Sequence, residues 1–303
     1  MVCIKNNGFQ IITIVIVGLS LLSSCSGELN EVQIESLVNE QGSHELVVSR
    51  KKEAGQGGAG MYTETQVNLS AKQKGDALLF NWIYGRTEAL KGQVSPREQE
   101  IINVYEGMVF ELEVKDQQIE LLNYPAVRKE LESLFLKAYR IDSVSDKSGM
   151  YAEVQQMFKS KASTSQSLLS SFFPEIPLLF TTLGSTLEHN SIVVTDSISS
   201  PYQQDVIHLI SKVSIEKMED EIEIIRTDSI PPAVLQEQLQ KYIQNVFGDK
   251  AASIPFDQMP QFNYRAVYAY WLNDDAELNE VEKTMYISNG GRAMKNTIAV
   301  EIK

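Results

Sequence analysis

Cysteine is nearly absent from this chain, and the copies it does have lie close to the N-terminus. The 303 residues include 2 cysteines, Cys3 and Cys25. Everything after residue 25 therefore lacks a disulfide, a thiol nucleophile and a thiolate ligand for a metal ion. Without covalent cross-links, the fold has to be stabilised by a substantial apolar core.

Basic residues are also scarce relative to acidic ones. Lysine and arginine total 27 against 40 aspartates and glutamates, which gives a net charge of −13 at pH 7. A chain with this surplus of negative charge is repelled by nucleic-acid phosphates and by anionic lipid headgroups. We therefore expect no nucleic-acid partner.

The common catalytic and cofactor motifs are missing or stand in the wrong context. The 3 histidines, His44, His189 and His208, are too far apart in sequence for two of them to bind a metal ion from one element. No G-x-S-x-G serine motif occurs. Gly55–Gly60 matches G-x-G-x-x-G, but a strand-like pattern follows it where a dinucleotide site needs a helix. The sequence predicts no catalytic residue, no cofactor and no bound metal.

Two acidic patterns leave other interpretations open. A pair of carboxylates such as Glu111 and Glu113 can hydrolyse glycosidic bonds, although on an alternating strand it more often faces solvent. Asn273–Glu277 could bind Ca²⁺ through oxygen atoms, but it lacks EF-hand spacing and also suits an acidic hairpin turn. A glycan hydrolase is therefore the least favoured hypothesis.

The N-terminal segment has the pattern of an export signal. Lys5 precedes an apolar run from Phe9 to Leu22, which is shorter than the ~20 residues that span a bilayer. The run ends in Leu22-Ser23-Ser24-Cys25, which resembles the lipobox of bacterial lipoproteins. The resemblance implies cleavage before Cys25, a thioether-linked lipid on Cys25 and acylation of its new amino group. Several acyl chains anchor a protein stably, so the membrane is an expected partner.

Further matches point to the outer envelope of Bacteroidetes. Residue 26 is serine, not the aspartate that resembles an inner-membrane retention signal, so we expect the outer membrane, facing the periplasm or the cell surface. Three Asp-Ser-apolar triplets resemble the O-glycosylation sequon of these bacteria, and they make Ser143, Ser197 and Ser229 candidate glycosylation sites. The resemblance to Bacteroidetes-type envelope lipoproteins is limited to the leader and these triplets, and it implies no known activity.

Hydrophobic periodicity predicts strands, then helices, then strands, a helix and final strands. The predicted strands are 45–50, 61–71, 77–84, 108–115, 191–195, 205–215, 219–228, 262–272, 280–288 and 295–302. Helices are predicted at 123–138, around 151–158 and, capped by Ser229, at 231–246; 159–167 is interpreted as a loop. This order is typical of an α+β fold, with a mostly antiparallel β-sheet and helices packed on one face.

The expected domain organisation follows from the leader and this pattern. Residues 1–24 are the predicted signal peptide, 25–43 a polar tether and 44–303 a single α+β domain. If the two strand–helix halves form separate units, the break falls near 185–190.

Aromatic side chains form rows on two predicted strands. Trp82 shares a face with other aromatic residues on a strand that is apolar on both faces, so we expect it in the core. The late strand carries a second row, which either packs in the core or lines a groove for an apolar or sugar ligand. Core packing is the favoured interpretation. The candidate groove residues are Tyr264, Tyr268, Tyr270 and, on the opposite face, Trp271.

These observations favour a non-enzymatic, membrane-anchored envelope lipoprotein that acts as a binding or assembly module. Its expected partners are the membrane, through lipid on Cys25, and an envelope protein, a glycan or an apolar ligand. The alternative is a carrier of lipid or another apolar ligand on a curved sheet, which requires a continuous apolar cavity. A hydrolase would require two inward carboxylates in a cleft.

Overall fold

The computed structural model describes residues 29–35, 42–54, 60–75, 77–91, 99–100, 102–115, 118–139, 141, 149–199, 206–218, 220–247, 262–289 and 292–303. The predicted lipidation site Cys25, the candidate glycosylation site Ser143 and most of the glycine-rich run lie outside these residues.

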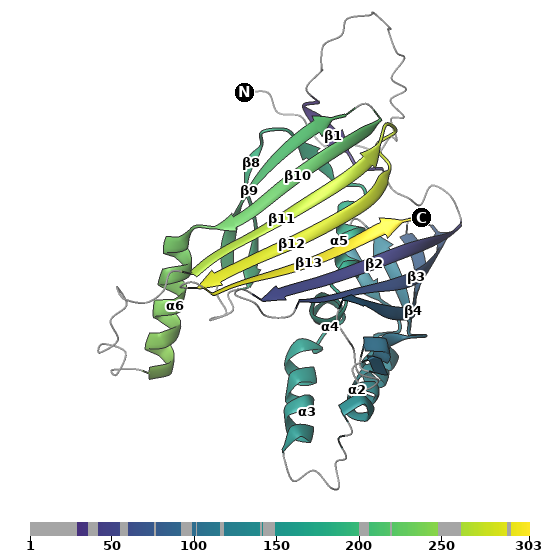
Figure 1. Cartoon of the computed structure of the whole chain (residues 1–303), viewed down its shortest axis with the longest axis vertical. Helices are drawn as coiled ribbons and strands as arrows, with labels where there is room; N and C mark the ends of the chain where they lie inside the picture. Colours follow the sequence, from purple (N-terminus) through teal and green to yellow (C-terminus); the bar gives the residue numbers. More distant parts are fainter. Residues whose placement is uncertain are drawn as a thin grey trace, which may run out of the picture.

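One antiparallel sheet of eleven strands dominates the fold (Figure 1). Its strands are β2 (Ser43–Ala54), β3 (Met61–Lys74), β4 (Ala77–Lys91), β5 (Val109–Lys115), β6 (Gln118–Leu121), β8 (Ile192–Ser199), β9 (Val206–Lys217), β10 (Glu221–Ile230), β11 (Phe262–Asn273), β12 (Leu278–Asn289) and β13 (Arg292–Ile302). The spatial order is β6-β5-β4-β3-β2-β13-β12-β11-β10-β9-β8. The last strand thus pairs with β2 and joins two meanders into one sheet.

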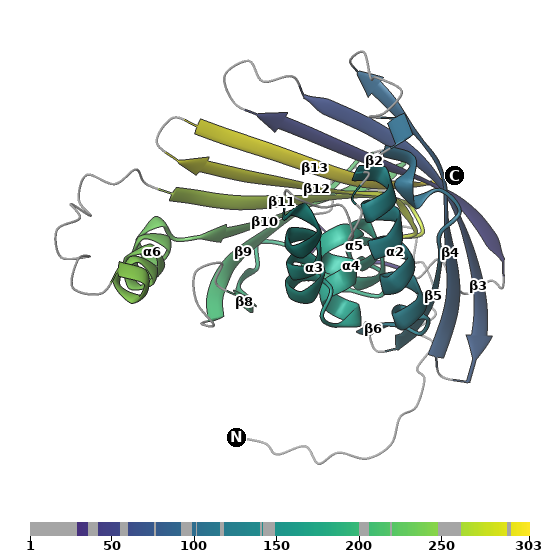
Figure 2. The same cartoon turned by 90° about the horizontal axis from the view of Figure 1, so that it is seen from below.

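The helices lie on the concave face of this sheet (Figure 2). Four of them connect the two meanders: α2 (Tyr124–Tyr139), α3 (Met150–Lys161), α4 (Ser165–Phe172) and α5 (Glu175–Thr182). A short 3₁₀ helix, η1 (Asn103–Tyr105), follows β4. Helix α6 (Pro232–Phe247) packs against the part of the sheet formed by β9, β10 and β11. The predicted α+β fold with helices on one face is confirmed. Among the described helices, none is both long enough and apolar enough to cross a bilayer.

The centre of the core lies between α5 and the inner face of β4 and β5. Strand alternation places Phe80, Trp82 and Phe110 on that face. Phe80 and Trp82 contact Phe180 of α5, and Phe110 contacts Phe173. The Phe80 and Phe180 ring centroids are 4.6 Å apart, and the Trp82 ring lies 6.3 Å from Phe180. Trp82 is 0% exposed, so the prediction that it belongs to the core is confirmed.

Part of the predicted tether belongs to the folded structure. Strand β1 (Glu31–Gln33) pairs with β7 (Thr186–Glu188) in a separate two-stranded sheet. Val32 and Ile34 are buried in the main core. Residues 29–35 therefore belong to the folded body, because a short apolar alternation inside a polar stretch is enough to bury one side of a strand.

The start of α6 also differs from the prediction. Ser229 does not cap this helix but lies within β10, opposite Ile210 of β9 and Arg265 of β11. The helix begins at Pro232. The predicted loop at 159–167 is shorter as well, since α3 runs to Lys161 and α4 begins after its cap, Thr164. In both places, long-range packing extends an element beyond its local sequence signal.

Candidate functional site

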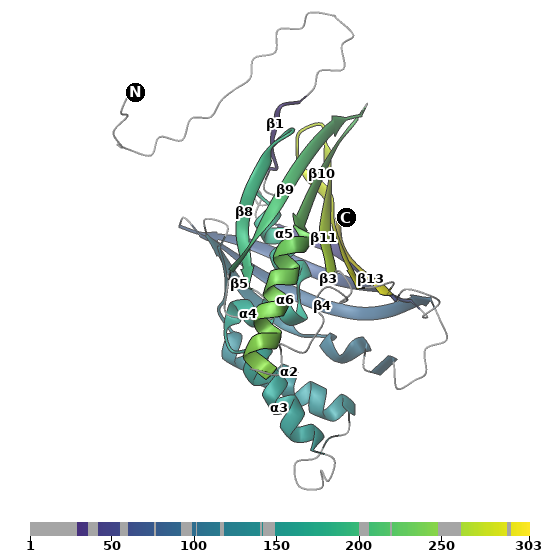
Figure 3. The same cartoon turned by 90° about the vertical axis from the view of Figure 1, so that its left-hand side faces the viewer.

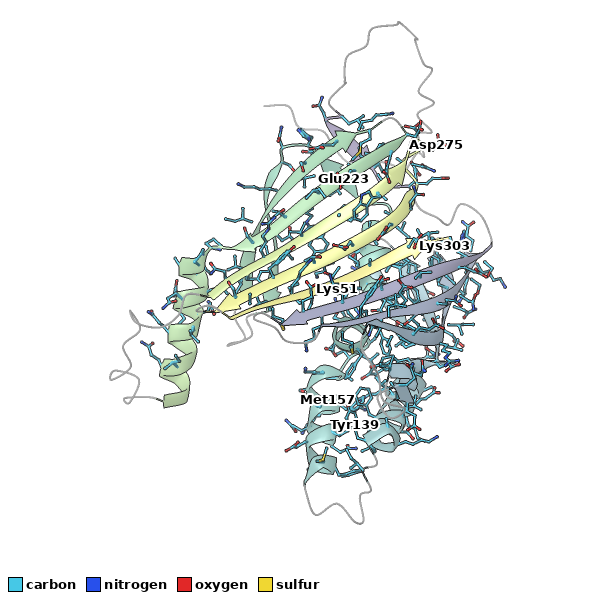
Figure 4. The ribbon with its side chains drawn as sticks, viewed as in Figure 1. Lys51, Tyr139, Met157, Glu223, Asp275 and Lys303 are labelled. Carbon is cyan, nitrogen blue, oxygen red and sulfur yellow. The ribbon has the colours of Figure 1, made fainter. Side chains whose placement is uncertain are left out.

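An apolar groove lies between α2 and α3, at the opposite end of the molecule from β1 (Figures 1 and 3). Its volume is about 360 Å³. Glu153 is the charged residue in the lining; the other lining residues are Phe135, Tyr139, Ile141, Met150, Val154 and Met157. Figure 4 labels Tyr139 on α2 and Met157 on α3.

The groove arises because these helices extend past the sheet that covers their other ends. Helix α2 buries Val127 and Leu131 in its first half, and α3 buries Phe158 near its end. The remaining apolar residues continue each stripe, and none of the described strands covers them. Tyr139 is 40% exposed and Met150 is 42% exposed, which is unusual for large apolar side chains that lie next to each other.

The floor of the groove is a fixed aromatic stack. The Phe135 ring stacks on Tyr139 with centroids 6.0 Å apart. The same ring meets the edges of Phe158 and Phe172 at 5.7 and 5.8 Å. Two flexible methionines, Met150 and Met157, complete the walls, and such side chains adapt their shape to an incoming apolar group.

This lining favours binding over catalysis. A volume of about 360 Å³ falls within the range of ligand sites, and an apolar wall with a single carboxylate is typical of recognition surfaces. Glu153, which is exposed, and the Tyr139 hydroxyl are the lining groups that could move a proton, and the lining contains no serine, threonine, cysteine, histidine or lysine. The groove can therefore hold apolar side chains or an acyl chain.

A buried ionic cluster connects α5 to the sheet. Arg50 Nη2 on β2 lies 2.5 Å from Glu175 Oε1, and the Tyr84 hydroxyl of β4 donates to the same oxygen. The side chain of Glu175 is 0% exposed. Burial, followed by the charge of Glu175, raises the pKa of Tyr84 well above its usual value. Burial also raises the pKa of the nearby Tyr105 to about 12.

Clusters of perturbed ionisable groups often mark active sites, but this one has the geometry of a clamp. Glu175 and Tyr84 are covered by the packing of α5 on the sheet, so a substrate cannot reach their polar atoms while α5 is in place. The cluster fixes the helical layer on the inner face. We assign it a structural role.

The four aromatic residues predicted as groove candidates lie on two different faces of the sheet. Tyr264, Tyr268 and Tyr270 lie on the inner face of β11, and Trp271 lies on the convex face. Tyr270 is 4% exposed, and burial raises its pKa. Tyr264 is half-buried and packs with residues near α6. The structure therefore places Tyr270 in the core and does not bring the four residues together; a ligand-binding role for the row stays a prediction.

The ring of Tyr268 lies close to two cationic side chains. Tyr268 is half-buried, and its ring stacks parallel to Tyr270 at 6.5 Å. The guanidinium of Arg226 lies 5.2 Å from the ring centroid, and the Lys283 ammonium lies 4.9 Å from it. Arg226 also donates two hydrogen bonds to the buried Asp228. These contacts fix the ring between two cations.

The remaining candidates have definite places in the structure. Ser197 lies in β8, and Ser229 lies half-buried in β10 with Oγ 3.5 Å from the Ile210 carbonyl oxygen. Glycosylation at either residue stays a prediction. In Asn273–Glu277, Asn273 Oδ1 accepts hydrogen bonds from the backbone N–H groups of Asp275 and Glu277, which gives the expected hairpin turn. Within the described part of the chain, no three acidic, histidine or cysteine side chains converge to hold a metal ion.

The groove between α2 and α3 was not predicted from the sequence. The signal was an apolar stripe on 123–138 that continues to Tyr139, followed by apolar residues from Met150 onward. Each stripe alone is typical of a helix packed on a core.

Comparisons with known proteins do not identify the chain. No protein-family model matches it, and no curated protein matches its sequence. Among solved structures, it is similar to a porin-like protein from Bacteroides uniformis at 8% sequence identity, over 86% of this chain and 95% of the other. The TM-score of 0.19 is too low to establish a shared fold, so no property of that protein is transferred.

Proposed function

We propose that this protein is a membrane-anchored envelope lipoprotein without enzymatic activity, which binds a partner protein through the groove between α2 and α3. The observation that carries the proposal is the groove itself. Large apolar side chains, Tyr139 and Met150, are exposed beside each other on a fixed aromatic floor. Exposed apolar surface of this kind marks interaction sites in otherwise well-packed proteins.

The position of the predicted lipid anchor sets the orientation of the groove. Only 3 residues lie between Cys25 and Leu29, where the described body begins, so the chain makes four residue-to-residue steps from one to the other. An extended chain of this length reaches about 14 Å, so lipid on Cys25 keeps the β1 end close to the membrane. Helices α2 and α3, which line the groove, lie at the other end of the molecule (Figure 3). The occupant of the groove therefore comes from elsewhere in the envelope and not from the anchoring bilayer.

The expected occupant is an amphipathic helix of another envelope protein. A groove between two helices accepts apolar side chains spaced along one face of a third helix. Methionine walls, supplied by Met150 and Met157, suit side chains of differing shape.

A carrier of lipid or another apolar ligand is the alternative function. The strong curvature of the sheet around the helices favours it (Figure 2). Against it, the inner face beneath α5 is already filled, because Trp82, Phe110 and Phe173 are fully buried there. A carrier would need an apolar cavity at the place where these rings pack.

Lipid attachment is tested by replacing the predicted acceptor. The full-length chain and its Cys25→Ala variant are expressed in the native host with radiolabelled palmitate. The parent chain should be labelled and membrane-bound, and the variant should stay an unprocessed or mis-sorted precursor without label. Equal labelling of both chains would end the lipoprotein claim.

Partner binding is tested by cross-linking in cells. A benzophenone-bearing phenylalanine replaces Tyr139 in the full-length chain, with the same replacement at Met61, an exposed methionine at the start of β3, as the control. A discrete protein adduct is expected from position 139 alone, and it should disappear when Met157→Glu is added. Adducts with lipid would support the carrier, and no adduct from position 139 would contradict both.

A further inference from the structure

A second hollow lies on the convex face of the sheet, which none of the described helices covers (Figures 1 and 2). Its volume is about 330 Å³. The hollow forms because Ala299 of β13 stands beside Glu282 of β12, with Ala269 of β11 on the other side of Glu282. Longer side chains surround these small ones. The lining residues are Ser49, Lys51, Tyr62, Glu280, Glu282, Thr297 and Ala299, and Figure 4 labels Lys51.

The carboxylates at the hollow lie close to one another, in an arrangement that destabilises the folded sheet. Glu280 stands directly opposite Glu301 of β13 in the antiparallel register, and Glu282 follows two residues along β12. Like charges directly opposite each other destabilise a sheet. Burial and these two neighbours raise the pKa of Glu280. Lys303 forms an ion pair with Glu301 and offsets part of this repulsion, but the pKa of Glu280 stays raised. Departures from the pairing rule tend to occur at functional sites.

A tryptophan stands beside the hollow on the same face. Trp271 of β11 is directly opposite Glu280 in the register of β11 with β12. On its other side it is opposite Glu223 of β10. Trp271 is half-buried, so it keeps some solvent-accessible surface, and it stands between two glutamates in the register.

The polar groups of the hollow include both donors and acceptors of hydrogen bonds. Lys51 supplies an ammonium group, which is ion-paired with Glu53 at 2.7 Å and keeps further donor positions. Ser49, Thr297 and Tyr62 supply hydroxyls. Glu282 accepts a hydrogen bond from Thr284, at 2.8 Å, and retains further acceptor positions. The Tyr62 hydroxyl donates to Glu64 at 2.7 Å and can still accept a hydrogen bond.

This combination points to one class of ligand. Each sugar hydroxyl both donates and accepts, and the apolar face of a sugar ring stacks on an indole. An apolar ligand would leave the polar groups of the hollow unpaired, and a polyanion would be repelled by its carboxylates. We propose that the hollow, together with Trp271, is a binding site for a neutral saccharide, separate from the groove between α2 and α3.

The indole provides a direct readout. The chain has 2 tryptophans, and because Trp82 is fully buried, a fluorescence change on adding a sugar reports on Trp271. The full-length lipoprotein in detergent is titrated with cellohexaose and with chitohexaose, and polygalacturonate serves as an anionic contrast. Binding is also measured by calorimetry, which does not depend on the indole.

We expect saturable binding of a neutral hexasaccharide with a dissociation constant of about 1 mM or lower. Glu280→Gln and Glu282→Gln should each weaken it about tenfold, because each removes a charged acceptor. Trp271→Phe should abolish the fluorescence response and weaken the calorimetric signal. The matched control is Glu111→Gln, which changes an exposed glutamate on the convex face of β5 and should bind like the parent chain.

Three outcomes would overturn the proposal. They are the absence of saturable binding for both neutral sugars, a preference for polygalacturonate, and binding by the Glu280→Gln and Glu282→Gln variants that equals the parent chain. The cross-linking experiment at Tyr139 is independent of this face, so either proposal can fail while the other stands.

Discussion

Arg50 of β2 and Glu175 of α5 lie 125 residues apart in sequence, yet Nη2 and Oε1 of this ion pair are 2.5 Å apart. The Tyr84 hydroxyl of β4 donates to the same carboxylate. One oxygen of a helix residue thus receives hydrogen bonds from two strands of the sheet. The contact determines where α5 sits on the inner face, and α5 in turn completes the core over β4 and β5.

Removing the cation of this pair should be costly. Arg50→Met leaves the buried Glu175 carboxylate without its charge partner, which typically costs about 3–5 kcal/mol. The free energy of unfolding in urea measures the loss. Lys241→Met is the control, because it breaks an exposed i,i+4 pair with Glu237 and should cost about 0.5 kcal/mol or less.

A double variant separates charge from shape. Combining Arg50→Met with Glu175→Leu replaces the ion pair by apolar side chains and should recover much of the loss, since no charge stays buried. If Arg50→Met alone lowers the free energy of unfolding no more than the Lys241→Met control does, the ion pair does not hold α5 on the sheet.

The two tryptophans should respond differently to truncation. Trp82 is 0% exposed among aromatic rings, so Trp82→Ala should cost about 3–5 kcal/mol. Trp271→Ala changes a half-buried side chain on the convex face and should cost clearly less. Urea unfolding followed by far-ultraviolet circular dichroism measures both without relying on the indole signal. Equal losses would place Trp271 in the core and exclude its role as a sugar platform.

Two tyrosines on the inner face of β11 should also differ in how much stability their truncation costs. Tyr270 is buried, so Tyr270→Ala should cost about 3–5 kcal/mol. Tyr268 is half-buried and gains contacts with Arg226 and Lys283, each worth about 0.5–1 kcal/mol. Tyr268→Ala should therefore be the milder change in thermal unfolding. A loss as large as that of Tyr270→Ala would assign Tyr268 to the core.

Much of the sheet could be predicted because its strands carry local signals. Thr63, Val67 and Leu69 alternate with polar residues on β3, and that alternation alone specifies a half-buried strand. Strand β1 has only 3 residues, too few to show a period, and its position depends on pairing with β7 and on the packing of Val32 in the main core. Ser229 precedes two prolines and matches a helix cap, but pairing with β9 and β11 continues through it. At such positions, long-range strand pairing overrides the local sequence signals that mark the start or end of an element.

Neither of the two proposed binding surfaces could be predicted in the same way. Exposure of Tyr139 and Met150 depends on where the sheet stops covering α2 and α3, which no local pattern encodes. The convex hollow depends on the register that places Ala299 opposite Glu282 and Glu301 opposite Glu280. A shift by one residue would send these side chains to the other face, so the hollow is defined only once the pairing is known.

The acid–base behaviour of Glu280 gives a test in which stability and binding should move in opposite directions. Burial, followed by Glu301 and Glu282, raises the pKa of this carboxyl above its ordinary value of 4.5. The folded chain therefore holds the proton more tightly than the unfolded chain does. The stabilising contribution of Glu280 to the free energy of unfolding is fully present below pH 4.5, and it is lost as the pH rises through the raised pKa. At pH 7 the ionised carboxylate is a destabilising charge.

Glu280→Gln should consequently stabilise the protein at pH 7, by about 0.2–1 kcal/mol for relief of an opposed like-charge pair. The gain should shrink as the pH falls toward 4, because the protonated glutamic acid resembles glutamine; thermal unfolding at both pH values measures it. Glu111→Gln, opposite Asn81 instead of an acid, should give a smaller gain at pH 7. A Glu280→Gln variant that is less stable than the parent at pH 7 would contradict the like-charge argument. A variant that is more stable but loses the hexasaccharide would show that the carboxylate serves binding at the expense of the fold.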